Sequence, residues 1–285
     1  MSAIVEHPIF VPYDRGRLAA VVTTPVGEPR GLTLLLTGIG LPQVIGSELA
    51  ARAALNLAQS GLASVRFDYE GIGDSTGVVP EFSLAVTESA AAQALSVLET
   101  AQRIAGADRF AVAGSCIGSR VALQLARRPD CVGAVCVALP FFELGTWTRL
   151  RRRSAVWAPV AFVRRHRLLR RVVLAPVKLV LAERTSQPRL QALSSALEHA
   201  RVLFVYSSSP RDYYDERVRH RLDDLVATLS PAGRARFELQ VLEAGPLTAF
   251  EALSQEAQNV IVDSVAGWLT TSFEMAARSS TISET

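Results

Sequence analysis

The sequence has few cysteines and no motif that spaces cysteine, histidine or acidic residues as metal ligands. Three cysteines occur in 285 residues. An odd number does not fit a disulfide framework, so we expect reduced thiols and a cytoplasmic protein. Because the sequence lacks Cys-x-x-Cys, His-Glu-x-x-His and any Cys/His cluster, we expect no metal. It also has no P-loop, and Gly71-Ile72-Gly73 is too short for a dinucleotide fingerprint, so we expect no cofactor.

Long apolar runs are absent as well. No uninterrupted apolar stretch approaches the roughly 18 residues that a transmembrane helix needs. The first ten residues, MSAIVEHPIF, lack the basic and then apolar regions of a signal peptide. Hydrophobic residues nevertheless make up 49% of the chain, which is enough for the core of one large α/β domain or of a domain with an insertion.

Lysine is nearly absent, and the basic charge is unevenly distributed. Lys178 is the one lysine among 30 basic residues. Residues 141–190 hold twelve of these basic residues but only two of the 27 acidic ones. The net charge of this segment is therefore about +10, and that of the rest of the chain is about −7. A basic segment lies within an otherwise acidic protein.

Short apolar runs alternate with longer alanine- and leucine-rich runs of helical period. The predicted strands are Ile9–Pro12, Leu18–Thr23, Leu32–Thr37, Ser64–Asp68, Arg109–Ala113, Val132–Val137, Val202–Tyr206 and Phe237–Leu242. The predicted helices are, roughly, Gly46–Ser60, Leu84–Ile104, Ile117–Arg127, Glu216–Leu229 and Ser254–Thr270. Two strands before the first helix indicate an antiparallel hairpin, and the alternation after it indicates a mostly parallel sheet covered on both faces.

The alternation of strands and helices stops between about Phe141 and Glu198. We expect two or three helices there, placed over the carboxyl edge of the sheet, where open α/β sheets bind ligands. The predicted organisation is a core of residues 1–140 and 199–275, a basic helical cap of residues 141–198, and a frayed tail of residues 276–285.

Residues 112–121 read VAGSCIGSRV, a strand-like run that passes through Gly-Ser-Cys-Ile-Gly into a helix-like run. This stretch resembles the nucleophile elbow of the α/β-hydrolase fold superfamily, with Cys116 where serine is usual. Three other stretches match in order: LLLTGIG resembles the oxyanion strand and loop, RFDYEGIGDS the turn after strand four, and VAGWL the last helix. The resemblance covers nearly the whole chain. It implies an α/β-hydrolase fold with an eight-stranded, mostly parallel sheet, helices on both faces and a helical cap inserted after strand six.

Cysteine at the elbow has a physical rationale. Small residues must flank a nucleophile on so tight a turn, and Gly114 and Gly118 meet this need. The N-terminus of the following helix stabilises negative charge and lowers the pKa of a thiol placed there. The resemblance implies an oxyanion hole formed by the backbone N–H groups of Ile39 and Ile117. The alternative is that Cys116 is a small buried residue with only a packing role, in an elbow that has lost its activity.

The expected catalytic histidine is missing. The family often places it after the last strand, as Gly-x-x-His-x-Phe, but residues 245–250 read GPLTAF, with Thr248 in the histidine position. Threonine cannot take a proton at neutral pH. Of the four histidines, only His166 in the cap could lie above Cys116 and serve as a substitute base. The alternative interpretation is that His166 is a solvated residue on a basic helix.

The acidic partner is also displaced. The family usually places an aspartate in a turn after the seventh strand, where the direct match here is Pro210. Asp212 fits only with a shift of two residues and is alternatively a solvated carboxylate. Some members place the acid after strand six, where Glu143 stands. Asp68 and Asp74 belong to the strand-four turn, which we expect them to shape, and Cys131 and Cys136 are expected in the core.

The cap contains a dense set of arginines among apolar residues, which gives one basic and one apolar helix face. It includes Arg151, Arg152, Arg153, Arg164 and Arg165. Three interpretations stay open: a solvated lid, a docking surface for an acyl carrier protein or for the phosphates of coenzyme A, and transient contact with an anionic membrane surface. Nucleic acid is not expected, because the rest of the chain is acidic and has no binding motif. The sequence does not indicate an oligomeric state.

The elbow and the oxyanion motif are thus present, while the proton-relay pair is disrupted. Hydrolysis needs a base for water, whereas a thiol can be acylated by a thioester with little help. We therefore predict a cysteine-dependent enzyme that processes acyl thioesters, an acyltransferase in lipid-like or specialised metabolism, with Cys116, Thr248 and Asp212 at the catalytic positions. Two alternatives are a thioesterase or esterase with an unlocated base, and a catalytically degenerate binding or scaffold protein.

Overall fold

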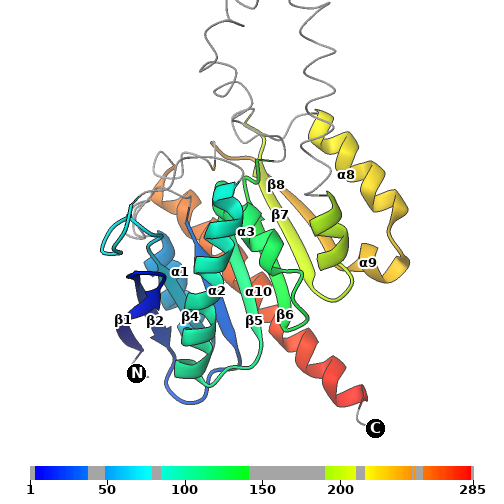
Figure 1. Ribbon diagram of the computed structural model, residues 1–285. Helices are drawn as coiled ribbons and strands as arrows, with labels where there is room; N and C mark the ends of the chain where they lie inside the picture. The colour runs from blue at the N-terminus through cyan, green and yellow to red at the C-terminus, as the bar shows by residue number, and fades with distance from the viewer. Residues whose placement is uncertain are drawn as a thin grey trace, which may run out of the picture.

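The computed structural model of the protein describes residues 4–37, 49–78, 85–140, 190–209, 216–245, 247 and 253–283. These residues contain one eight-stranded sheet of order β1-β2-β4-β3-β5-β6-β7-β8 (Figure 1). Its strands are β1 (Val5–Tyr13), β2 (Gly16–Thr24), β3 (Leu32–Leu36), β4 (Ala63–Phe67), β5 (Phe110–Ser115), β6 (Cys131–Val137), β7 (Arg201–Ser207) and β8 (Phe237–Leu242). β2 is antiparallel to both of its neighbours, and every other pair is parallel. The predicted sheet is confirmed.

The central strands are almost wholly buried because both of their faces are covered. Every residue of β3 and β4 is buried, as are the first five residues of β5. Side chains alternate between the two faces, so that Leu34 joins one hydrophobic cluster and Leu35 the other. This burial on both faces is typical of a parallel sheet between two helical layers.

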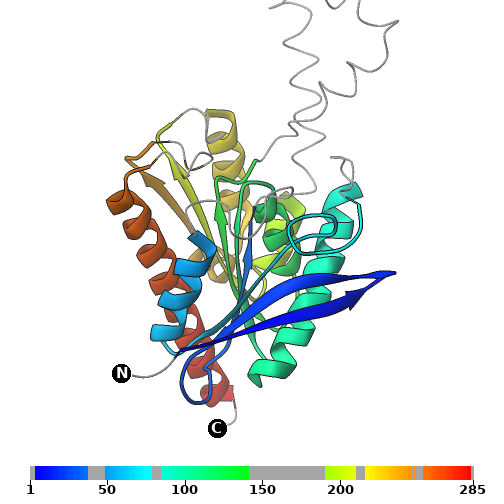
Figure 2. The same ribbon diagram turned by 90° about the vertical axis from the view of Figure 1, so that its left-hand side faces the viewer.

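The outer strand β1 has a different character. It forms a long hairpin with β2, whose register runs from Val5 opposite Thr24 to Tyr13 opposite Gly16. Most of its residues are exposed, and it contains Pro8 and Pro12. Figure 2 shows this hairpin projecting from the rest of the sheet.

Helices cover both faces of the sheet, as Figure 2 shows in side view. The helices are α1 (Leu49–Gln59), α2 (Ala85–Ala105), α3 (Ile117–Leu125), α8 (Glu216–Thr228), α9 (Pro231–Ala235) and α10 (Gln255–Ser283). The first cluster contains Leu98 of α2, Val121 of α3 and Leu222 of α8. The second contains Leu57 of α1 and Leu269 of α10. The five predicted helices are therefore present, with α2, α3 and α8 on one face and α1 and α10 on the other.

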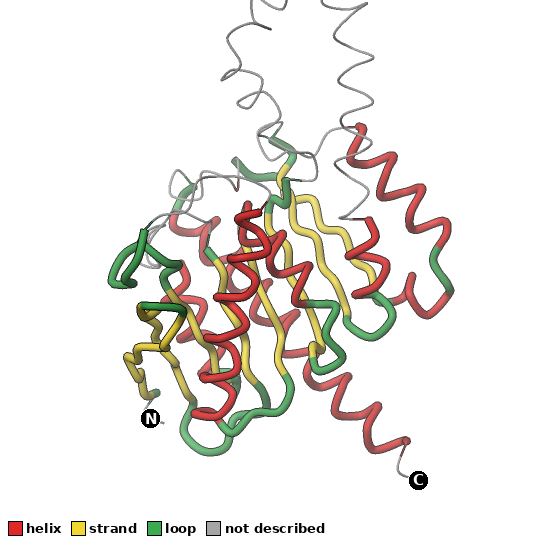
Figure 3. Tube along the Cα trace, in the orientation of Figure 1, coloured by secondary structure: helices red, strands yellow, loops and turns green. Residues whose placement is uncertain are grey.

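The last helix is longer than predicted. α10 runs over 29 residues to Ser283 and extends past the end of the strands (Figure 3). The frayed tail that we predicted from residue 276 is therefore helical as far as Ser283. The tail is anchored where Arg109 donates to the carbonyl oxygen of Ala276 at 3.0 Å, and Ala276 also packs against the second cluster.

The short helix α9 was not predicted, although the sequence carries its signals. Pro231 is its first residue, where proline is favoured. The hydroxyl of Ser230, the N-cap, accepts from the backbone N–H of Gly233 at 3.1 Å. Only five residues long, α9 has no helical periodicity that a pattern search could find.

Part of the predicted cap lies against the core. Residues 190–196 are helical, and Leu193, Ala196 and Leu197 are buried in the first cluster. Residues 141–189 lie outside the described residues, so the cap itself stays a prediction. Within the described part of the chain, no helix is long and apolar enough to cross a membrane.

Two glycines test the packing of α10. Gly267 is exposed on α10, and a Cβ there would have no atom within 4 Å apart from the adjacent backbone of its own helix. A Cβ at Gly31 would instead overlap the ring of Phe273. We expect Gly267→Ala to raise the free energy of unfolding by about 0.5–1 kcal/mol, because alanine loses less backbone entropy in a helix. We expect Gly31→Ala to lower it by roughly 1–3 kcal/mol through overpacking. Urea unfolding of both variants checks this, and the opposite order would mean that α10 does not pack here.

Candidate active site

Cys116 lies on the turn between β5 and α3. Its backbone has φ 50° and ψ −117°, a conformation that is unfavourable for a residue with a side chain. Two hydrogen bonds hold it: the Cys116 N–H donates to the Val137 carbonyl at 2.9 Å, and the Ser119 N–H donates to the Cys116 carbonyl at 3.1 Å. The strained turn predicted for an elbow is therefore present at Cys116, which is half-buried.

The flanking glycines allow this turn to form. A Cβ on Gly114 would overlap the backbone of Gly118, and one on Gly118 would lie 2.5 Å from the carbonyl oxygen of Thr37. Any side chain at these positions would push α3 away from β3 and β5. The two glycines thus bring the N-terminus of α3 against the carboxyl ends of both strands.

Sequence reasoning did not identify Ser119 as part of the elbow. Its hydroxyl is fully buried and lies 2.7 Å from the Gly114 carbonyl and 2.8 Å from the Val137 carbonyl. It therefore joins the first turn of α3 to the ends of both β5 and β6. A serine just after the second glycine was the available signal, but one of its two acceptors, Val137, is on a strand that only the fold brings close.

One of the two predicted oxyanion donors can be placed. Ile117 is the first residue of α3, so its backbone N–H has no carbonyl one turn earlier within the helix. The Cys116 N–H is already donated to Val137. Ile117 is thus the first residue of α3 whose N–H has no acceptor within the helix, while Ile39 lies outside the described residues.

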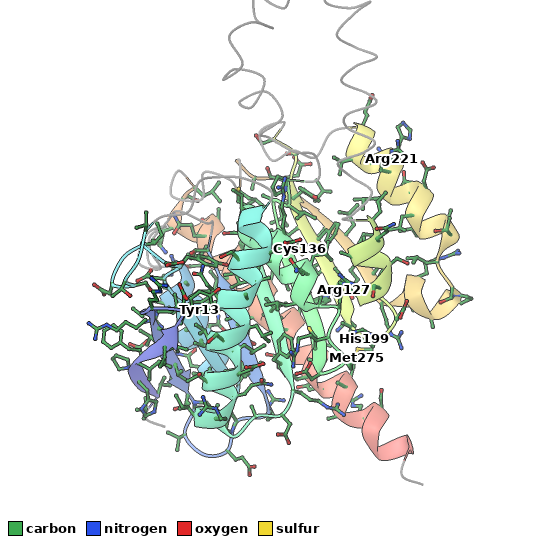
Figure 4. All side chains as sticks on the ribbon, in the orientation of Figure 1. Tyr13, Arg127, Cys136, His199, Arg221 and Met275 are labelled. Carbon is green, nitrogen blue, oxygen red and sulfur yellow. The ribbon has the colours of Figure 1, made fainter. Side chains whose placement is uncertain are left out.

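The other two cysteines are core residues, as predicted. Cys131 is 2% exposed and Cys136 is fully buried. Burial raises the pKa of Cys131 to about 12, and burial also raises the pKa of Cys136. Figure 4 shows Cys136 inside the molecule, where its thiol lies 3.5 Å from the Ser119 carbonyl oxygen.

The strand-four turn has the structural role expected of it. The buried Asp68 carboxylate accepts from the Asp74 N–H at 3.3 Å. The Ser75 hydroxyl donates to the Asp68 carbonyl at 2.6 Å and accepts from the Ala19 N–H of β2 at 2.8 Å. Asp68 and Asp74 therefore shape the turn, and Ser75 fastens it to β2.

Several predicted site residues lie outside the described residues. These are Thr248, Asp212, Ile39, Arg151, Arg152, Arg153, Arg164 and Arg165, with Glu143 and His166. Their roles stay predictions.

Three histidines can be placed. His7 is on the outer strand β1, and His220 is exposed on α8. His199 comes before β7, so it lies at the opposite edge of the parallel sheet from Cys116, which follows β5. Within the described ranges, no group of three or more His, Cys, Asp and Glu residues could hold a metal ion.

Comparison with curated proteins gives sequence matches over part of the chain. No protein-family model matches the chain. RutD of Klebsiella pneumoniae, which its name describes as a carbamate hydrolase, is 36% identical over 121 residues. The match covers 42% of this chain and 42% of RutD, so the chain spans less than half of the curated relatives that it matches.

Solved structures match over nearly the whole chain. Est1E from Butyrivibrio proteoclasticus, with ferulic acid bound, has a TM-score of 0.61 and 12% identity, covering 93% of this chain and 99% of that one. The thioesterase domain from the curacin biosynthetic pathway has a TM-score of 0.56 and 15% identity, covering 92% and 99%. Likeness at such identities shows a shared fold.

The burial of the thiols predicts a selective chemical modification. In the folded protein at pH 8, we expect iodoacetamide to alkylate Cys116 first, because Cys131 stays protonated well below its pKa of about 12 and both core thiols are inaccessible. Intact-protein mass spectrometry should show one adduct, none in Cys116→Ser, and three in the wild type denatured in urea. Equal labelling of Cys131 or Cys136 in the folded protein would contradict this assignment.

Proposed function

Because the chain has the α/β-hydrolase fold, we propose that it is an acyl-processing enzyme of hydrolase type in which the Cys116 thiolate attacks the carbonyl carbon of an ester or thioester. The observation that carries the proposal is the strained backbone of Cys116 at the N-terminus of α3. Such strain is retained where surrounding contacts impose it, and it often marks a site of chemistry. The names of the matched proteins, a carbamate hydrolase and a thioesterase domain among them, support a hydrolase.

The proposed reaction begins with attack by the Cys116 sulfur. The carbonyl oxygen becomes an oxyanion, which the N–H of Ile117 and the predicted N–H of Ile39 stabilise. Each such donor contributes roughly a hundred- to thousandfold in rate. The tetrahedral intermediate then collapses, the bond to the leaving group breaks, and an acyl-cysteine remains. Attack by water on this thioester regenerates the thiol and releases the acid.

Thioesters suit this site better than alkyl esters. An alkoxide must be protonated as it leaves, whereas a thiolate leaves with little protonation. The family's proton donor would be a histidine, and Thr248 occupies its position. A cysteine nucleophile and a thioester substrate together reduce the need for that histidine.

Acyl transfer is the second candidate function, and Thr248 is the observation that favours it. Without a base to activate water, the acyl-cysteine would persist until a better nucleophile arrived. The basic set of the predicted cap, which includes Arg151 and Arg164, would then bind an acyl carrier protein or the phosphates of coenzyme A. In this proposal the acyl group passes from one thioester through Cys116 to an acceptor amine, alcohol or thiol.

An acylation experiment tests the role of Cys116. We expect intact-protein mass spectrometry to show one acyl adduct with acyl-coenzyme A, formed faster than with the N-acetylcysteamine thioester of the same acyl group, which lacks phosphates. Cys116→Ala should abolish the adduct and lower any turnover by roughly a thousandfold or more. Cys131→Ala, which removes a buried thiol, is the matched control and should keep both. Full activity in Cys116→Ala would overturn the assignment of Cys116 as the nucleophile. No adduct and no turnover with any donor would leave the scaffold interpretation.

A second variant separates hydrolysis from transfer. We expect Thr248→His to hydrolyse the acyl-cysteine on the order of a hundredfold faster, because imidazole can take a proton from water. The gain should appear as pH rises through about 6.5, where free imidazole loses its proton. Thr248→Asn, which cannot take a proton, is the control. If the wild type already hydrolyses its adduct as fast as Thr248→His, the transfer candidate is wrong and the hydrolase proposal stands.

A further inference from the structure

We propose that Arg120 is a positioning residue for Cys116, because it fixes the backbone at the exit of β6 on which the elbow depends. Arg120 lies on α3, four residues after Cys116, and is half-buried. It contacts Pro140, three residues beyond the end of β6. The positioning role of Arg120 does not depend on the proposed function. Only the reaction assigned to Cys116 does.

Hydrogen bonds from Arg120 and from Cys116 link α3 and its N-cap to the chain that leaves β6. Arg120 donates from Nε at 3.2 Å and from Nη2 at 2.9 Å to the carbonyl oxygen of Pro140. Cys116 donates from its backbone N–H to the carbonyl oxygen of Val137 at 2.9 Å. A ring therefore runs from Cys116 to Val137, along the chain to Pro140, across to Arg120 and back along one turn of α3. Because both cross-links join α3 to the β6 exit, neither segment can shift without straining the other.

The segment inside this ring is strained and needs to be held. Ala138 has φ 49°, which is uncommon for a residue with a side chain and persists only where the surroundings impose it. Its N–H donates to the Val205 carbonyl of β7 at 2.8 Å. The Tyr206 hydroxyl donates to the Leu139 carbonyl at 3.0 Å. β7 thus holds the segment from one side and Arg120 holds its far end from the other.

Arginine suits this position better than lysine. Nε and Nη2 lie on one edge of the planar guanidinium group, so both can point at a single carbonyl oxygen. Hydrogen bonds from a charged donor are also stronger than those between neutral groups. A lysine could offer one N–H from a flexible stem and would restrain Pro140 less.

The conformation of Cys116 depends on hydrogen bonds to the segment that follows β6. The Val137 carbonyl receives the Cys116 N–H, and the Ser119 hydroxyl also lies within reach of it. If the Val137–Pro140 segment relaxed, Cys116 could leave its strained φ, and its sulfur would move from the N-terminal end of α3. Arg120 would then affect the reactivity of a thiol that it need not touch.

The experiment compares Arg120→Met and Arg120→Lys with Arg127→Met. Arg127 is an exposed arginine just beyond the other end of α3 and is the matched control (Figure 4). Hydrogen–deuterium exchange of residues 114–119 reports on the Cys116 amide without any substrate. The rate of iodoacetamide alkylation at Cys116, measured from pH 6 to 9, reports on the thiol. Thermal unfolding checks that each variant is folded.

For Arg120→Met we expect faster exchange in residues 114–119 and roughly three- to tenfold slower alkylation at pH 7, as the thiol loses the helix N-terminus. Arg120→Lys should recover part of both, and Arg127→Met should match the wild type. If Arg120→Met does not fold, Tyr206→Phe removes the neighbouring bond to Leu139 and should give a smaller change of the same kind.

Unchanged exchange in residues 114–119 in a folded Arg120→Met would overturn the proposal, whatever chemistry Cys116 performs. An equal change in Arg127→Met would overturn it too, since the effect would then belong to charge and not to the contact with Pro140. If Cys116 forms no acyl adduct while the exchange and alkylation results hold, the proposed function fails and the positioning role of Arg120 stands.

Discussion

The close approach of α3 to the ends of β3 and β5 is the constraint on which the site depends. It requires two positions without a side chain, Gly114 and Gly118, and it forces Cys116 between them into a strained backbone conformation. That strain must be offset by contacts from elsewhere in the fold. They come from the end of β6, where Val137 accepts the Cys116 N–H. The strained conformation of Cys116 is thus maintained by three strands and a helix, and no local sequence preference would produce it alone.

Much of this could be predicted from the sequence because the signals are local. Buried strands such as β3 and β5 consist mostly of apolar residues, and the helices between them have a clear helical period. Two glycines at fixed spacing around Cys116 indicate the elbow in the sequence. The same reasoning placed Cys131 and Cys136 in the core and gave Asp68 a structural role, both of which the structure confirms.

What could not be predicted depends on contacts between distant segments. Arg120 and Ser119 look like ordinary helix residues in the sequence, and only the fold brings the β6 exit to them. The left-handed conformation at Ala138 has no sequence signal, since alanine does not favour it. The end of α10 was predicted to fray because the tail is rich in serine. In the structure, Arg109 just before β5 anchors the helix at Ala276.

The two prolines of β1 bear on how this sheet can meet other chains. Proline has no N–H to donate, so within a strand it is confined to an edge, where its nitrogen faces away from the neighbouring strand. Pro8 and Pro12 are four residues apart and therefore face the same side of β1. Every second donor along that outer edge is missing, which hinders the addition of a strand from another molecule. At the other end of the sheet, β8 reads FELQVL and contains no proline, with Leu239 and Val241 exposed. β8 itself therefore lacks the protection that the two prolines give to β1.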